Sequence, residues 1–481
     1  ELMTVGGGGL ATFAGEVSIS TGKSLSFSPP VYTSAVQGIK FDQAGGDMDA
    51  IIQPARLAGN GGIVLVLGSN CYVNTSGGTV RYNSGEESSF IEVRPEGQIA
   101  FGAGGTGADP IARMKIDANS RISLSNNDNS NTANTVFGKS AFNASSNNGS
   151  DYNTAVGELA MGTGSVSASI RNGAFGYRAL TDITTGQSNQ AFGYDSATNL
   201  TIGYYNVAMG TNALYSETIG DRTTAIGESA LFSQVSDSNN ETTGNVGVGF
   251  AVSYHNVTGI NNTAVGYEAL GGAVGNSHSY NTGVGYNALH STTNGGYNVS
   301  LGSRSGEDLT TGDFNVFVGD YAGHSSTDLN NAVAIGHSAL GGADSDADGT
   351  VAIGYSALSS LTTGVRNVAV GNLALGYNDT GTDNTAIGWN ALSDQNVGGS
   401  GHAADSDYNT AIGSLSMSGA WADAKSEYNV GVGGSTLAGA MNGANNNSAL
   451  GYAALASVTT GDNNTAVGAS ALLNVKTGEG N

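Results

Sequence analysis

Residues Asn262–Leu270 read NTAVGYEAL, and close copies of this nine-residue stretch recur from about residue 131 to the end of the chain. Further clear copies are Asn281–Leu289 (NTGVGYNAL), Asn384–Leu392 (NTAIGWNAL) and Asn464–Leu472 (NTAVGASAL). Aligned on the central glycine, nineteen copies lie between Gly138 and Gly468, most often 17 residues apart and never closer. A fixed minimum period with insertions predicts a structural coil from which occasional loops project.

Each position of the repeat has its own chemical character. The residue before the central glycine is apolar in all nineteen copies, and the residue four after it is Leu, Met or Phe in fifteen. Thr-Ala-Val-Gly alternates with a period of two, which we expect to turn Val or Ile toward the interior. One coil holds too few apolar groups for a core. We therefore expect the coils to stack at the β-strand spacing of about 4.8 Å, which gives a rod about 90 Å long.

Glycine and asparagine are expected to hold the stack together. Glycine lets neighbouring backbones approach and turn. Asn stands four before the glycine in sixteen copies, and stacked Asn side chains would hydrogen-bond along the rod and satisfy the turn amides. The structural residues predicted in this way are Gly266, Gly285, Gly371, Gly388, Gly468, Asn262, Asn281, Asn367, Asn384 and Asn464. The sequence thus predicts an all-β protein with a parallel β-solenoid or β-roll of about nineteen coils.

The positions of the prolines divide the chain into two parts. All five prolines precede residue 111, and a ladder of backbone hydrogen bonds would exclude proline from the repeats. We predict a compact N-terminal β region over residues 1–110, for attachment or as a joint, with a buried strand at Ile63–Leu67. A connector follows over 111–130 and the solenoid shaft over 131–481. Asn481 stands where the corner Asn of a twentieth copy would fall, so we expect the repeats to continue beyond it.

Composition excludes several classes of function. The formal charge is −23, and an acidic surface repels nucleic-acid phosphates and anionic lipid, so we expect neither as a partner. The longest apolar run, Ile63–Leu67, is too short for membrane insertion. The six histidines show no metal-ligand spacing, and Ser and Gly are so abundant that hydrolase-like strings carry no information, so we predict that the protein is not an enzyme. We expect Cys71, the single cysteine, to be a small buried strand residue.

The repeat also resembles sequences of known proteins. Asn-Thr-Ala-Val-Gly-Tyr-x-Ala-Leu, with Thr-Thr-Gly-x-x-Asn between copies (Thr362–Asn367, Thr459–Asn464), resembles repeats of phage fibre-like proteins and of some bacterial surface proteins. VAIG at Val333–Gly336 and Val351–Gly354 is similar to the shorter repeat in the head domains of trimeric autotransporter adhesins. Ala112–Leu124 resembles a β segment of phage tail fibres. The resemblance implies a homotrimer of parallel β-rolls, although the 17-residue period exceeds that of the adhesins.

From this resemblance we expect the structural shaft of a phage tail or other virion fibre, which spaces or presents a host-binding tip. Its location would be the virion surface or the extracellular space. Its partners would be two further copies of the chain, a virion attachment protein or fibre tip, and a host cell-surface glycan. A bacterial trimeric surface adhesin or extracellular filament is the alternative, and a polysaccharide-degrading tailspike is a further one.

One acidic stretch has the spacing of a calcium loop. Asp344, Asp346 and Asp348 precede a glycine in the order Asp-x-Asp-x-Asp-Gly, in which alternate carboxylates converge on a hard cation. Tyr355 stands where the bidentate Glu of such a loop would be. A solvated acidic turn is therefore the alternative interpretation, and calcium is the only cofactor that we consider.

Aromatic residues suggest contact with a glycan. An aromatic residue often follows the central glycine, as at Tyr267, Tyr286 and Trp389, and Trp421 lies in one of the longer insertions. Such rings can stack on sugar faces. The structural alternative is a ladder of rings in which each covers the neighbouring coil.

Overall fold

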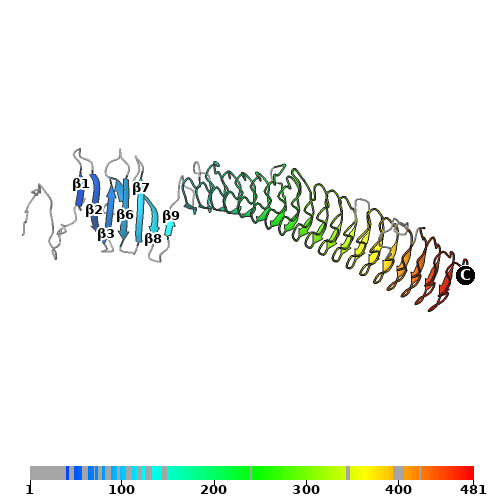
Figure 1. Ribbon diagram of the computed structural model, residues 1–481. Helices are drawn as coiled ribbons and strands as arrows, with labels where there is room; N and C mark the ends of the chain where they lie inside the picture. The colour runs from blue at the N-terminus through cyan, green and yellow to red at the C-terminus, as the bar shows by residue number, and fades with distance from the viewer. Residues whose placement is uncertain are drawn as a thin grey trace, which may run out of the picture. The chain divides into compact units, whose positions relative to one another are not determined.

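A computed structural model describes residues 39–42, 48–56, 63–69, 71–73, 79–81, 88–94, 98–104, 111–116, 122–124, 133–142, 149–238, 241–342, 347–393, 406–421 and 424–481. The chain divides into two compact units, unit 1 over Glu1–Ser125 and unit 2 over Asn126–Asn481. The described residues form strands and turns (Figure 1), and among them no helix is long and apolar enough to cross a membrane.

Unit 1 contains an antiparallel sheet of seven strands in the order β1-β2-β3-β6-β7-β8-β9 and a separate hairpin of β4 and β5. The sheet strands are β1 (Ile39–Asp42), β2 (Met48–Arg56), β3 (Ile63–Ser69), β6 (Ser88–Arg94), β7 (Gln98–Gly104), β8 (Ile111–Ile116) and β9 (Ile122–Leu124), and the hairpin strands are β4 (Cys71–Val73) and β5 (Thr79–Arg81). Residues 111–130, predicted as a connector, thus supply β8 and β9 to this sheet. Cys71 is buried, as expected, and its Sγ donates to the carbonyl of Ser89 at 3.2 Å.

Unit 2 is a parallel β-solenoid, which confirms the predicted fold of the repeats. Its nineteen strands of three residues pair in sequence order. Pairing is in register with the repeat, as where Val265 lies opposite Val284. The strands are β10 (Thr135–Phe137), β11 (Thr154–Val156), β12 (Gly173–Phe175), β13 (Gln190–Phe192), β14 (Val207–Met209), β15 (Thr224–Ile226), β16 (Val246–Val248), β17 (Thr263–Val265), β18 (Thr282–Val284), β19 (Val299–Leu301), β20 (Val316–Val318), β21 (Val333–Ile335), β22 (Val351–Ile353), β23 (Val368–Val370), β24 (Thr385–Ile387), β25 (Thr410–Ile412), β26 (Val430–Val432), β27 (Ser448–Leu450) and β28 (Thr465–Val467).

The interior of the solenoid is lined by the middle residue of each strand and by the residue four after the glycine. Ala264 in β17 and Leu270 are fully buried, whereas Val265 is only partly buried. Our prediction that Val or Ile points inward is therefore wrong. The physical reason is the width of the coil: a Cβ atom at Gly283, the middle of β18, would already lie 3.2 Å from Leu270 Cγ. Even a methyl group at this position is in tight contact with its neighbours, and a β-branched side chain does not fit.

One strand shows how the interior keeps its volume when the repeat changes. Gly306 and Gly323 replace the large residue four after the glycine in two consecutive coils. In the strand between them, β20, the middle residue is Phe317, which is fully buried. Cβ atoms at Gly306 and Gly323 would lie 2.8 and 2.6 Å from its ring. Phe317 therefore fills the space that two Leu side chains occupy elsewhere.

The central glycine is required for two independent reasons. Gly266 has a φ of +135°, which side chains rarely adopt, and a Cβ atom there would lie 2.4 Å from the carbonyl oxygen of Gly285. Two residues that follow it, Glu268 and Leu270, are also left-handed, at a cost of about 1 kcal/mol each. Their amides donate to carbonyls of the coils on either side, Phe250 O and Ala288 O, both at 2.9 Å. Stacking thus offsets the strain of each turn.

Candidate functional site

A buried ladder of Asn side chains runs along unit 2 at the corner before sixteen of the nineteen strands. Asn262 is typical: its Nδ2 donates to the carbonyl of His278 at 2.8 Å, and its Oδ1 accepts the backbone N–H of Asn281 at 3.0 Å. The predicted residues Asn281, Asn367, Asn384 and Asn464 make the corresponding bonds. Each Asn satisfies a backbone carbonyl and a backbone amide that would otherwise be buried without partners, at about 1–3 kcal/mol each.

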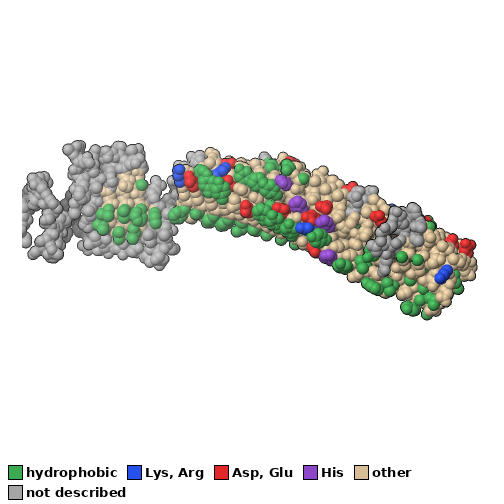
Figure 2. All heavy atoms as spheres, in the orientation of Figure 1, with side chains coloured by type: hydrophobic (Ala, Val, Ile, Leu, Met, Phe, Trp, Pro, Cys, Tyr) green, Lys and Arg blue, Asp and Glu red, His purple; other side chains and the backbone are tan. Residues whose placement is uncertain are grey.

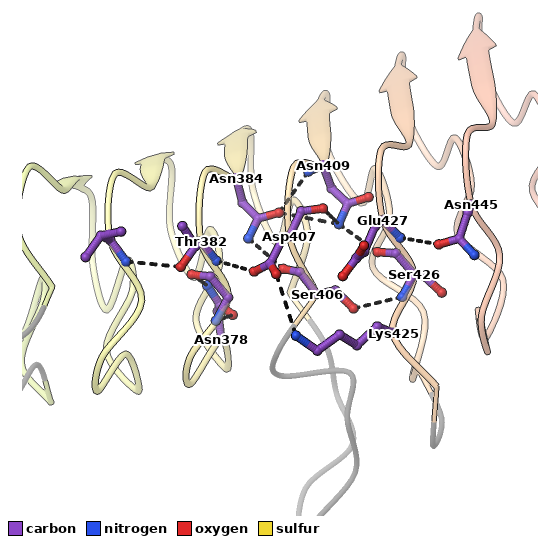
Figure 3. A network of polar contacts seen from close by, with 12 residues as sticks. Asn378, Thr382, Asn384, Ser406, Asp407, Asn409, Lys425, Ser426, Glu427 and Asn445 are labelled. Atoms are coloured by element: carbon purple, nitrogen blue, oxygen red, sulfur yellow. Dashed lines mark hydrogen bonds and ion pairs between the residues drawn. The ribbon is translucent and has the colours of Figure 1, made fainter.

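A second polar ladder, six residues before the glycine, was not predicted. In Figure 3, Asp407 Oδ1 accepts the backbone N–H of Thr382 at 2.7 Å, and Asn445 Oδ1 accepts that of Glu427 at 2.8 Å. Lys425 Nζ lies 3.6 Å from Asp407 Oδ2. The signal was present in the sequence as Asp-x-Asn, which recurs immediately before the strands. Five aspartates of the repeats therefore have a structural role in capping turn amides, namely Asp221, Asp313, Asp348, Asp407 and Asp462.

The candidate calcium loop lies largely outside the described residues, because Asp344 and Asp346 are not among them. The remaining member, Asp348, belongs to the second ladder, where its Oδ1 accepts the backbone N–H of Asn330 at 2.7 Å. Within the described ranges, no group of three or more His, Cys, Asp or Glu side chains could hold a metal ion. The calcium site thus stays a prediction.

The aromatic residues after the glycine stack on one another. The Tyr267 ring lies between Phe250 and Tyr286, with centroid separations of 5.1 and 5.4 Å. The other side of Tyr286 faces the guanidinium of Arg304 at 5.7 Å. A sugar cannot reach faces that are already covered, so the geometry at Tyr267 and Tyr286 favours a structural ladder.

The two tryptophans differ from this pattern and from each other. Trp421 is 3% exposed and belongs to the hydrophobic core, so the ring that we expected in a recognition loop packs inside the solenoid. Trp389 is 51% exposed. The residues at its position in the neighbouring coils are Asn372 and Ser414, which carry no ring. Of the four predicted glycan contacts, Trp389 alone has a ring that aromatic neighbours leave open.

The most extensive surface feature is the outward side of β10–β28, which we call the strand face. It consists of the first and last residues of the nineteen strands, and none of these is charged, although the chain has a formal charge of −23. The last residue is apolar in every strand, and several are well exposed, among them Leu301, Ile387 and Leu450. Figure 2 shows hydrophobic side chains along the edge where Figure 1 places the strands. Contiguous exposed apolar surface of this kind marks an interaction site.

Further aromatic stacks flank the strand face. Five residues before the glycine, Tyr280, Tyr297 and Phe314 stack with centroid separations of 4.8 and 5.0 Å. The rings after the glycine, including Tyr267, border the other end of each strand. Both stacks are about half-exposed at their edges, so they extend the apolar surface on either side of the strands.

Histidines occur in two different settings. On the outside, His290, His324 and His337 each lie 3.1–3.6 Å from a carboxylate of a neighbouring coil. Figure 2 shows histidine side chains near acidic groups midway along unit 2. In the interior, His278 is fully buried beside the Asn ladder, and its Nδ1 lies 3.4 Å from Asn262 Oδ1. Burial lowers the pKa of His278 to about 4, against a smaller opposing effect of a backbone hydrogen bond with Leu270. This side chain is therefore neutral at neutral pH.

Comparison of the chain with protein-family models, curated proteins and solved structures finds no match. The functional argument therefore depends on the geometry of the solenoid and on the strand face.

Proposed function

We propose that this protein is a component of a structural fibre, in which unit 2 forms the shaft and three copies of the chain associate through their strand faces. The observation that carries the proposal is the strand face itself, an uncharged surface with an apolar residue in every row that runs the length of an otherwise acidic solenoid. Nineteen strands about 4.8 Å apart and about 10 Å wide present about 900 Å². In a trimer each face is shared between two partner copies, so the two interfaces of one chain together bury about as much as the roughly 800 Å² that each partner buries in one standard interface.

A further copy of the same chain is the partner that fits this surface. It has the same length and the same row spacing, so apolar rows meet apolar rows along the whole face. It also carries its charges elsewhere, on the turns, where like charges of neighbouring copies stay solvated. A smaller globular partner would leave most rows uncovered. The number three is supported by the resemblance to adhesin heads.

A stack of nineteen coils is stiff along its axis, since every strand pairs with the next in one sheet and the Asn ladder bonds most neighbouring coils as well. Such a shaft suits a protein that holds a host-binding tip away from its base, on a virion surface or outside a cell. The phage fibre is the proposal that we favour. The alternative, a bacterial adhesin or extracellular filament, uses the same shaft and the same strand face. A glycan receptor and an attachment protein remain proposed partners.

The mass of the native particle tests this proposal. Light scattering on the purified full chain, with negative-stain images of the same sample, should give three times the 48.0 kDa chain mass on a thin rod. A single-chain mass would overturn the homotrimer.

A matched pair of variants tests the strand face directly. Val265→Lys with Val318→Lys and Val370→Lys places three ammonium groups per chain in the proposed interface, where desolvation costs several kcal/mol per ion. We expect this variant to be a single folded chain. The control, Asn294→Lys with Thr311→Lys and Ser325→Lys, adds the same charge at exposed turn positions and should keep the trimer mass. Equal masses for both variants would remove the strand face from the proposal.

A further inference from the structure

Unit 1 has an apolar face of its own. Six large side chains on β3, β6 and β7 are each 37–43% exposed, and we call them the unit 1 patch: Leu65, Leu67, Ile91, Val93, Ile99 and Phe101. Strand register places them in two complete rows across the three strands. One row is Leu65, Val93 and Ile99, and the other is Leu67, Ile91 and Phe101. Figure 2 shows them together on the visible side of unit 1.

The two sides of β6 and β7 are the reverse of those of an ordinary half-buried sheet. The covered side of β6 and β7 carries Ser88, Glu92, Ala100 and Gly102, all buried, together with Phe90. The open side carries the branched and aromatic residues. The prediction of a buried strand at Ile63–Leu67 is therefore wrong for one side of β3, where Leu65 and Leu67 are exposed. Strands β6 and β7 thus bury a carboxylate while six large apolar side chains of β3, β6 and β7 are exposed, which leaves a hydrophobic surface on the outside of the single chain.

We propose that the unit 1 patch packs against the same patch of the other copies and thereby sets the axial register of the fibre. This inference rests on the proposed homotrimer. Because unit 1 and unit 2 belong to one chain, association through the strand faces would raise the effective concentration of the patches toward each other. The patch contains no charged residue, so identical copies meet without repulsion. Its two short rows of three side chains match another copy of themselves.

A register device is needed because the strand face cannot supply one. Its nineteen rows all end in an apolar residue and most begin with Thr or Val. Two copies displaced by one row, about 4.8 Å, would therefore lose one row of contacts and keep the others. Register is strongly specified only where a shift changes which groups meet. The unit 1 patch occurs once in the chain and has no repeat, so two patches match each other in one register only.

Cross-linking in full-length chains measures the register. Val265 and Val284 lie opposite each other in adjacent rows of β17 and β18. Differently tagged Val265→Cys and Val284→Cys chains, both with Cys71→Ser, are refolded together and oxidised. A disulfide requires Cβ atoms within about 4.5 Å, so it distinguishes rows about 4.8 Å apart. With the patch intact, we expect disulfides between equal positions. With Ile91→Lys and Phe101→Lys, we expect the particle to keep three chains. It should then form 265–284 disulfides in a yield comparable to that of disulfides between equal positions.

The other outcomes separate the possible failures. If the Lys variant keeps three chains and forms disulfides only between equal positions, the inference is overturned and the proposed fibre stands. If the unsubstituted chain is already single, the homotrimer fails, and this inference with it. The control, Ile91→Val with Phe101→Leu, keeps the patch apolar and should form only equal-position disulfides. The formation of 265–284 disulfides in this control would show that the fold of unit 1, rather than its apolar face, sets the register.

Discussion

Two stretches of the solenoid have the same backbone and different interiors. Around residues 176–200 the large inward side chains are aliphatic, with Leu180, Ile183 and Leu200 fully buried, and the buried polar residues there, such as Ser196, are small. Around residues 234–292 the buried inward positions include Gln234, Ser253, Asn256, His278 and Thr292. Among the described residues, Gln234 Nε2, Ser253 Oγ, His278 Nε2 and Thr292 Oγ1 have no hydrogen-bond partner. The Asn ladder, the central glycine and the strand are the same in both stretches. The coil is therefore determined by its backbone contacts, and the interior can vary.

The largest effect should be equal in the two stretches. Gly176→Ala and Gly266→Ala each place a Cβ atom 2.2–2.4 Å from the carbonyl oxygen of the next coil at a φ that only glycine tolerates. We expect each to cost at least about 4 kcal/mol of local stability, because both strain and overlap must be relieved by separating coils. Hydrogen exchange of the flanking amides measures this. Gly275→Ala is the control: its φ is +87° and nothing lies near the added atom, so only the strain remains. If Gly176→Ala and Gly266→Ala lost very different amounts of local stability, the two stretches would not share the same backbone requirement.

The two interiors should respond differently to substitution by Ala at one repeat position. Leu180 and Ser253 both lie four residues after the glycine and both are buried. Leu180→Ala should cost about 3 kcal/mol, since it leaves a cavity in a packed interior. Ser253→Ala should be neutral or stabilising, because it removes a buried hydroxyl without a partner. The midpoint of urea unfolding compares the two. A substantial loss for Ser253→Ala would mean that the hydroxyl is satisfied.

Acid should weaken only the polar stretch. The folded-state pKa of His278, about 4, lies below its unfolded value of 6.5, so folding favours the neutral form. Its contribution is fully present above pH 6.5 and is lost as the pH falls toward 4. The shift corresponds to about 3 kcal/mol.

His278→Gly provides the test of this pH dependence, because several other coils carry glycine at that position, among them Gly259 and Gly295. The variant should abolish this part of the pH dependence of urea unfolding between pH 7 and pH 4. If the variant and the parent lose stability in parallel, another group is responsible.

The smallest effect concerns the outside of the solenoid. Tyr297 is stacked on both sides, by Tyr280 and Phe314. Tyr152, at the same repeat position, is 60% exposed, and the next coil carries Arg171 there. We expect Tyr297→Ala to cost about 1 kcal/mol and Tyr152→Ala distinctly less, because ring stacking adds to area burial. Thermal unfolding followed by circular dichroism compares them. Equal losses of stability in the two variants would show that ring stacking on the outside of the solenoid adds nothing to its stability.

Prediction from the sequence succeeded where a local requirement recurs. The central glycine and the corner Asn, such as Gly266 and Asn262, each serve one coil and its neighbour, so their role repeats at a fixed position. The second polar ladder was missed although Asp-x-Asn recurs, because acidic residues on a turn were interpreted as solvated. Trp421 was placed in a recognition loop because it lies in an insertion, and nothing local indicates that the solenoid interior has room for it.

The sequence by itself determined the period and the parallel stack of coils, because these follow from spacing and from residue types that few conformations tolerate. Only the tertiary structure decided which side of each strand faces inward. An alternation of period two shows that Thr263 and Val265 share one side and that Ala264 lies on the other, but it does not distinguish inside from outside. In unit 2 the width of the coil makes that choice in favour of Ala. In unit 1 the β4–β5 hairpin, which contacts β2, β3 and β6, leaves Leu65 and Ile91 on the open side.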